Sequence, residues 1–236
     1  MGSDRVTATT DTGRTTKPPW RQRREDYVEA LYRLGRSLDS RNPHQVAHAR
    51  RVLARMRRSL GDDRYLPDVL ELVEEHGPPG TEQEEEVWVY TAGLYALAPK
   101  RPSGGSGGGH PLGAALRACG DGPSTEARLR QLLAADWPTL RNRLRQAVQL
   151  IRGAGVALDH HALLDDLVVL RTEPQGGVRA HKVHLRWVRD FRRGPRTASE
   201  RAKSTDGTGA PPPDAPDDHS DEPTATTVDN GAGAPS

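Results

Sequence analysis

Apolar side chains recur three or four residues apart along most of this 236-residue chain. This spacing places them on one face of a helix, since an α-helix has about 3.6 residues per turn. We therefore predict two consecutive amphipathic helices in the first quarter of the chain. Their apolar positions form two series on either side of Asn42 and Pro43: Tyr27, Leu31, Leu34 and Leu38, then Val46, Ala49, Leu53, Met56 and Leu60.

Prolines and glycines mark the bounds of two more helices before residue 100. Pro67 suits the first turn of a helix over 68–75 that ends at Gly77. A fourth helix starts in the acidic block at 82–86 and runs to Pro99. Acidic side chains at a helix start interact favourably with the helix dipole, so this block needs no functional role.

The second half contains signals for five helices. Alternating strands joined by a hairpin dipeptide do not occur, and a single isoleucine in the whole chain argues against a sheet. The predicted fold class is therefore all-α, a helical bundle of about nine helices in two halves with disordered termini. The five helices of the second half are 112–118, 125–135 with Ser124 as N-cap, 138–151 closed by Gly153 and Gly155, 160–170 capped by Asp159, and 178–192 stopped by Gly194 and Pro195.

Composition divides the chain into five segments. Residues 1–19 and the acidic tail at 195–236 offer almost nothing apolar to bury, which predicts disorder at both ends. Residues 20–98 form an N-terminal helical half and residues 111–194 a C-terminal half. Between them, the Gly- and Ser-rich stretch at 99–110 predicts a flexible surface loop.

The formal net charge of +2 hides a strong asymmetry along the chain. In residues 195–236, three basic residues stand against eight acidic ones, a charge of −5, which leaves +7 on residues 1–194. A basic folded part suggests a polyanionic partner, although solubility alone is another explanation.

Three of the predicted helices carry rows of basic side chains beside or opposite their apolar faces. On the last helix the row, which runs from Arg179 to Arg193, falls within an arc of about 80°, at 100° per residue. The residues that we predict to contact nucleic acid on these helices are Arg50, Arg51, Arg55 and Arg58, then Arg141 and Arg145, then Arg179, Lys182, Arg186 and Arg189.

An ordinary solvated face is the other explanation for these rows, because 30 of the 34 basic residues are arginine. However, solvated helices usually interleave Glu with Arg, and residues 41–58 contain no Asp or Glu. Arginine presents a planar group that binds phosphate oxygens in pairs. We therefore predict binding to a nucleic-acid backbone by rows that merge into one continuous track.

Recognition of bases is not expected from this composition. Four Trp, five Tyr and one Phe are too few for a platform on which bases stack. No short helix exposes Asn, Gln and Ser beside its arginines, as a helix-turn-helix reader would. The contacts that we expect are to the backbone and shape of the nucleic acid.

Three motifs could carry chemistry, but each is weak. Asp-His-His at 159–161 is similar to the tripeptide of a metal-dependent phosphoesterase superfamily, whose supporting carboxylates come from strands that are not predicted here. His181 and His184 could share a metal, yet few further donors accompany them. The glycines at 104–109 lack the Lys-Ser/Thr of a phosphate loop. We expect no enzyme, no cofactor and no bound metal.

The chain shows no membrane or export signal. No stretch reaches the roughly 18 consecutive apolar residues of a membrane span, and the N-terminus lacks the apolar run of a secretory signal. A single cysteine, Cys119, excludes an internal disulfide and fits a reducing compartment. These features predict a cytoplasmic protein with no membrane partner.

Five motifs follow one another in the second half: HPLGAALR at 110–117, STEARLRQLLAAD at 124–136, LRQAVQLI at 144–151, DHHALLDDL at 159–167 and RWVRDF at 186–191. In this order and spacing they resemble the CasB family, the small subunit of the type I-E CRISPR surveillance complex Cascade. The resemblance covers about 110–193 well and 24–98 more loosely. It implies an all-helical subunit that is not catalytic.

The resemblance also implies partners and site residues. The family forms a head-to-tail pair beside the large subunit and the backbone subunits, and holds the guide RNA–target DNA hybrid and the displaced strand in a basic groove. Family basic positions match Arg50, Arg51 and Lys182 here, and more loosely Lys100 and Arg101. Three family arginine positions do not carry over, because this chain has alanine there: Ala114, Ala134 and Ala135.

Two other functions remain open at this point. A freestanding helical DNA-binding regulator would use similar basic faces but would protect one defined DNA site. A phosphoesterase built around 159–161 would need a bound metal ion. Arginine rows without base-reading residues favour the Cascade subunit, because base pairing supplies the sequence specificity in such complexes and the protein supplies backbone contacts.

Overall fold

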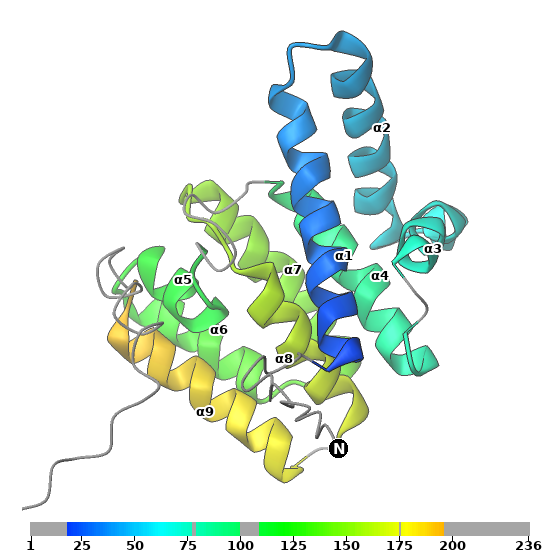
Figure 1. Ribbon diagram of the computed structural model, residues 1–236. Coiled ribbons are helices and arrows are strands. Elements are labelled where there is room, and N and C mark those ends of the chain that lie inside the picture. Colours follow the sequence, from blue (N-terminus) through cyan, green and yellow to red (C-terminus); the bar gives the residue numbers. More distant parts are fainter. Residues whose placement is uncertain (1–17, 77–78, 100–108, 175, 196–236) are drawn as a thin grey trace, which may run out of the picture. The chain divides into compact units, whose positions relative to one another are not determined.

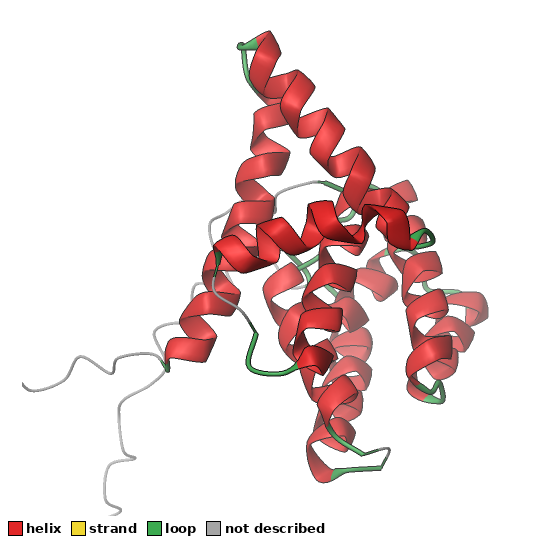
Figure 2. Ribbon diagram, turned by 90° about the vertical axis from the view of Figure 1, so that its right-hand side faces the viewer, coloured by secondary structure: helices red, strands yellow, loops and turns green. Residues whose placement is uncertain are grey.

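The computed structural model describes residues 18–76, 79–99, 109–174 and 176–195. Over these residues the chain forms nine α-helices, two short 3₁₀ turns and no strand, which confirms the all-α prediction (Figures 1 and 2). None of the described helices is both long and apolar enough to cross a membrane. The helices are α1 (Pro19–Arg36), α2 (Pro43–Ser59), α3 (Leu66–Glu75), α4 (Glu82–Leu97), α5 (Leu112–Ala118), α6 (Pro123–Leu133), α7 (Trp137–Gly153), α8 (His160–Thr172) and α9 (Val178–Arg193).

Helix α4 forms the centre of the core. Its residues 87–97 include no charged side chain, and all of them are buried. A helix that is apolar on every side has to be covered on every side, and α2, α3, α7 and α8 pack against α4 (Figure 1). Tyr27 of α1 stacks on Trp88 of α4, with ring centroids 4.6 Å apart, and donates a hydrogen bond to the Trp88 carbonyl oxygen at 2.8 Å. Helix α4 therefore joins the two predicted halves in one core.

Helix α9 packs along α5 and α8. The approach to α5 depends on Gly113, because a Cβ at this position would collide with the carbonyl oxygen of Trp187. Trp187 and Phe191 are buried in this contact region of α9. The lack of a side chain at Gly113 thus allows the backbones of α5 and α9 to approach closely. This contact determines which face of α9 is exposed to solvent.

The helix caps agree with the sequence signals, with one exception. The Asp159 side chain accepts hydrogen bonds from the His161 and Ala162 amides at 3.0 and 3.1 Å, which confirms it as the N-cap of α8. Gly194 has φ +71° and ends α9 as predicted. The prediction of Ser124 as an N-cap is wrong, because Ser124 lies inside α6. The helix starts at Pro123, two residues before the predicted start at 125, and a proline has no amide hydrogen that needs a cap.

The predicted disordered and flexible segments mostly lie outside the described residues, including 1–17, Lys100 to Gly108 and 196–236. At the boundary predicted between residues 19 and 20, Pro19 already belongs to α1, so its assignment to the disordered segment is wrong. His110, at the end of the predicted loop, exchanges backbone hydrogen bonds of 2.9 Å with the Ala157 carbonyl and the Asp159 amide. This end of the loop is therefore held against the α7–α8 connection.

Candidate nucleic-acid interface

The basic row predicted on the last helix lies on the outer side of α9. Ala180, Trp187 and Phe191 are buried on the inner side, as the periodicity predicts. The outer side exposes all four residues that were assigned to nucleic acid: Arg179, Lys182, Arg186 and Arg189.

Two of these four cations have carboxylate partners. Arg179 Nη1 lies 3.2 Å from Glu173 Oε1, in the segment between α8 and α9. Arg186 contacts Oδ1 of the buried Asp166 on α8. Because both acids come from outside α9, the periodicity of α9 alone does not reveal these pairs. Arg179 and Arg186 are thus partly neutralised and also contribute to the structure.

The remaining positive charge of α9 lies on four exposed residues. Within the described part of the chain, none of the four has an ion-pair partner, and Asp190 is the only acidic residue on this helix. Arg193 is the last member of the predicted row, and Arg192 lies beside that row at the C-terminal end of the helix. We call these four residues the α9 face: Lys182, Arg189, Arg192 and Arg193.

The row on α2 is also divided between paired and unpaired side chains. Arg55 Nη1 lies 2.6 Å from Asp68 Oδ1 of α3. Arg58 lies over the Tyr65 ring, 5.4 Å from its centroid. Arg50 and Arg51 are exposed, and no carboxylate among the described residues pairs with either. We call Arg50, Arg51 and Arg58 the α2 face.

The two arginines predicted on α7 adjoin the end of α2. Arg141 and Arg145 line one cavity of about 300 Å³ together with Leu60, the residue that follows α2. Arg141 is 3.3 Å from Glu86 and 5.2 Å from the Tyr90 ring centroid, so it is held in place. Arg145 is exposed and has no carboxylate partner among the described side chains. Arg145 therefore extends the α2 face onto α7.

Glu86 explains why Arg141 is held. Its carboxylate accepts hydrogen bonds from Trp137 Nε1 at 2.9 Å and from Arg171 Nε at 2.7 Å. Although partial burial opposes ionisation, these hydrogen bonds and the charges of Arg171 and Arg141 hold the pKa of Glu86 below its ordinary value. Glu86 thus stays charged and joins α4, α7 and α8, and Arg141 belongs to this structural network.

The α2 face and the α9 face are separate. Helix α2 packs against α1, α3 and α4, whereas α9 packs against α5 and α8. Figure 1 shows α2 at the upper right and α9 at the lower left, with α1, α7 and α8 between them. Within the described residues, the prediction of one continuous track is therefore wrong, and the structure has two basic faces. Lys100 and Arg101 lie outside the described residues.

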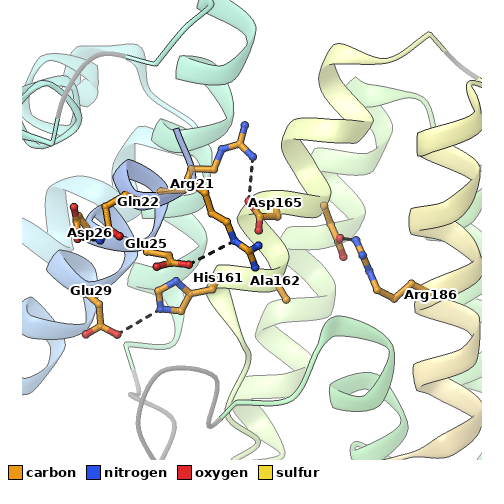
Figure 3. Close-up of a pocket in the computed structure, with 11 residues that line it drawn as sticks. Arg21, Gln22, Glu25, Asp26, Glu29, His161, Ala162, Asp165 and Arg186 are labelled. Carbon is orange, nitrogen blue, oxygen red and sulfur yellow. Dashed lines mark hydrogen bonds and ion pairs between the residues drawn. The ribbon is translucent and has the colours of Figure 1, made fainter. Parts of the chain in front are cut away.

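A cavity of about 570 Å³ opens between α1, α8 and α9 (Figure 3). Arg24 on its wall pairs with Glu84 at 2.7 Å and with Asp165 at 3.0 Å. His161 points toward Glu29, 3.5 Å away. Since acidic side chains outnumber the arginines around this cavity, it offers a phosphate no surplus of positive charge.

The Asp-His-His tripeptide at 159–161 caps the start of α8 and packs that helix into the core. Asp159 caps the helix, and the His160 ring lies edge-on to Tyr32 and Tyr95 at centroid distances of 6.0 and 5.1 Å. Burial lowers the pKa of His160 to about 4. His160 is therefore a neutral core side chain near pH 7.

Two exposed features were not singled out by periodicity. Arg192, a member of the α9 face, lies outside the basic row that the periodicity of the last helix predicts, and its position in the last turn before Gly194 was the available signal. Trp20, at the start of α1, is 46% exposed and carries the Arg24 guanidinium 4.7 Å from its ring centroid. His181 and His184 were singled out, but no group of three metal-ligating side chains forms anywhere in the described residues.

Comparison with known proteins assigns the chain to a family. The family model for CRISPR-associated protein Cse2 matches residues 52–191. Comparison with the curated proteins finds no match.

Three solved structures are similar in fold to this chain. CasB from Thermobifida fusca is 27% identical with a TM-score of 0.54, and the match covers 75% of this chain and 99% of that one. A Cse2-family CRISPR-associated protein from Thermus thermophilus is 29% identical with a TM-score of 0.53, over 72% and 98%. A chain of a CRISPR RNA-guided surveillance complex is 18% identical with a TM-score of 0.53, over 79% and 98%, and is similar in fold alone. With the family match spanning more than half of its length, the chain belongs to the CRISPR-associated Cse2 (CasB) family.

Proposed function

We propose that this protein is the non-catalytic small subunit of a type I-E CRISPR Cascade surveillance complex. In this role the α2 face and the α9 face bind nucleic-acid backbone and stabilise the guide RNA–target DNA hybrid and the displaced strand. Its partners are the guide RNA, the target DNA, the large subunit and the backbone subunits of the complex, in the cytoplasm. A second copy binds head to tail within the assembly.

The observation that carries this proposal is the unpaired positive charge on two helices of a Cse2-family protein. Arg50, Arg51, Lys182 and Arg189 are exposed, and no described carboxylate pairs with them. Unpaired cations on a fixed helix repel one another, and phosphate groups relieve this repulsion. The separation of the two faces suits a long polyanion that touches the protein at more than one place.

The predicted site residues do not contribute equally under this proposal. Arg55, Arg141, Arg179 and Arg186 already contact carboxylates, so we assign them to supporting the faces. The contacts to phosphate come mainly from the unpaired members. We retain Lys100 and Arg101 as candidate contacts on the strength of the family resemblance.

A freestanding helical DNA-binding regulator is the second candidate, because it would use the same basic faces. The two functions differ in footprinting on the protein's own genomic DNA. A regulator protects one defined site, whereas a subunit whose specificity comes from base pairing protects none by itself.

The direct test is recovery of the protein from the cells that produce it, followed by sequencing of any RNA that is recovered with it. The proposal predicts a stoichiometric assembly that contains RNA with CRISPR-repeat sequence at its ends. A matched preparation of the R50E/R51E/K182E/R189E variant should recover less of this RNA. A protein that purifies alone and without repeat-derived RNA would refute the proposal.

A further inference from the structure

The α9 face has an excess of positive charge that the described residues do not neutralise. Helix α9 carries six basic residues and one acidic residue. Its two pairs with acids outside the helix are Arg179 with Glu173 and Arg186 with Asp166. Four exposed cations remain, and two of them, Arg192 and Arg193, lie in the last turn, where they also interact favourably with the negative end of the helix dipole.

Beyond residues 195–205, which carry three basic residues and one acidic residue, the chain enters an acidic segment. Residues 206–229 contain seven Asp or Glu and no Lys or Arg. This acidic segment lies beyond residue 191, where the family match ends. It is therefore not part of the region that identifies the chain as a Cse2-family protein.

The length of the connection allows the acidic segment to reach every cation of the α9 face. Helix α9 has 16 residues and is therefore about 24 Å long at 1.5 Å per residue. The 20 residue-to-residue steps from Gly194 to Asp214 can span at most about 66–72 Å. Tethering holds such a segment at an effective concentration on the order of millimolar, which favours an otherwise weak contact.

We propose that the acidic segment 206–229 binds the α9 face of the same molecule and competes there with nucleic acid. The segment presents a row of carboxylates to Lys182, Arg189, Arg192 and Arg193, as a phosphate backbone would. A guide RNA–target DNA hybrid, with its much denser charge, displaces the segment, whereas weak nonspecific contacts do not. The competition rests on the function proposed above, but the contact between segment and helix does not.

The α2 face is the less favourable site for the same segment. Helix α2 lies away from the C-terminal end of α9, with α1, α7 and α8 between them (Figure 1). The segment would have to cross these helices before reaching Arg50 or Arg51. We therefore expect the acidic segment to contact α9 and not α2.

The experiment uses the full-length chain and a full-length neutral-tail variant that carries D214N, D217N, D218N, D221N and E222Q. A synthetic peptide of residues 206–229 is added to the isotopically labelled neutral-tail variant, and backbone amide shifts are followed by NMR. A peptide with the same five substitutions is the control. We expect saturable shifts at residues 182–193 with the acidic peptide only, and their loss in the neutral-tail variant that also carries K182E and R189E.

Competition is measured by the affinity of both full-length proteins for a fluorescent mixed-sequence DNA. At low salt we expect the neutral-tail variant to bind about three to ten times more tightly, from the effective concentration of a tethered competitor. The difference should vanish near 0.5 M salt, where charges are screened within a few ångströms.

The outcomes separate the two proposals. Equal shifts with the acidic and neutral peptides, or shifts confined to α2, overturn the assignment of the segment to α9. Peptide binding without any DNA binding by either protein leaves the contact intact and refutes the proposed function. Equal DNA affinity of the two proteins, both of which bind, overturns the competition.

Discussion

The indole Nε1 of Trp187 donates a hydrogen bond of 2.6 Å to Oδ2 of Asp166. Both residues are buried, and the other oxygen of Asp166 contacts Arg186. One carboxylate on α8 thus satisfies a buried donor and also holds the cation next to it on α9. The orientation of the α9 face relative to α8 depends on this contact.

Removing the Asp166 carboxylate should therefore destabilise the protein. D166A leaves the buried Trp187 N–H without an acceptor, which costs on the order of 1–3 kcal/mol. We expect the free energy of unfolding, measured by urea denaturation, to fall by about this amount. D165N is the matched control, since Asp165 is 43% exposed and its pair with Arg24 should contribute under about 1 kcal/mol. Equal losses in the two variants would contradict this role of Asp166.

Glu86 should be a second point of sensitivity. E86A leaves Trp137 Nε1 and Arg171 without their partner on α4, so we expect a loss of about 1–3 kcal/mol in the free energy of unfolding. E82A, at an exposed position of the same helix, should change stability by less than about 0.5 kcal/mol. Thermal unfolding of both variants checks the difference. A neutral effect of E86A would show that the network does not stabilise the junction of α4, α7 and α8.

Two glycine-to-alanine substitutions should have opposite signs. At Gly113 the added methyl group meets the Trp187 backbone, which cannot move without displacing α9, so G113A should cost about 1–3 kcal/mol. At Gly153 nothing lies within 4 Å of an added Cβ, and alanine should raise helix stability by up to about 1 kcal/mol. Calorimetry compares the two melting temperatures. A stabilising G113A would mean that α5 and α9 are not in close contact.

His160 should make the protein less stable in mild acid. Its pKa is about 4 in the folded state and about 6.5 when unfolded, so the unfolded state binds more protons in between. The His160 contribution is therefore fully present above pH 6.5 and is lost progressively as the pH falls toward 4.

Denaturation curves between pH 7.5 and 4.5 measure this effect. H160Q should have a flatter dependence of stability on pH over that range, even if it is less stable at pH 7.5. The acidic groups with a lowered pKa, Asp62, Glu86 and Asp136, lose their contributions only at lower pH. Burial also lowers the pKa of His184, but His184 is present in both proteins, so its effect cancels in the comparison. An unchanged slope in H160Q would show that His160 titrates normally in the folded protein.

Local sequence signals were sufficient for the helices. Asp159 as a cap, Gly194 as a stop and the buried stripe at Ala180, Trp187 and Phe191 all depend on neighbours within one or two turns. Pro123 shows the limit of such reasoning, since a proline can begin a helix without the cap that Ser124 was expected to supply.

The candidate site could be predicted only in part, because its charges depend on contacts between helices. The absence of acids in 41–58 correctly indicated an Arg-rich surface on α2 but did not reveal Asp68 of α3, which pairs with Arg55. In the same way, Asp166 reaches Arg186 from the preceding helix. Whether separate rows join is also a property of packing, and the separation of α2 from α9 has no signature in either helix alone.

The central claim is that unpaired cations on two faces bind nucleic-acid backbone, and its most direct test is the salt dependence of affinity. Binding of a mixed-sequence DNA is measured by fluorescence anisotropy from 50 to 300 mM salt. For K182E/R189E, and separately for R50E/R51E, we predict weaker binding and a slope of log K against log salt that is smaller by about two. The matched control, R128E/R130E on α6, should leave the slope within experimental error. Unchanged slopes in both face variants, or an equal change in the control, would contradict the account.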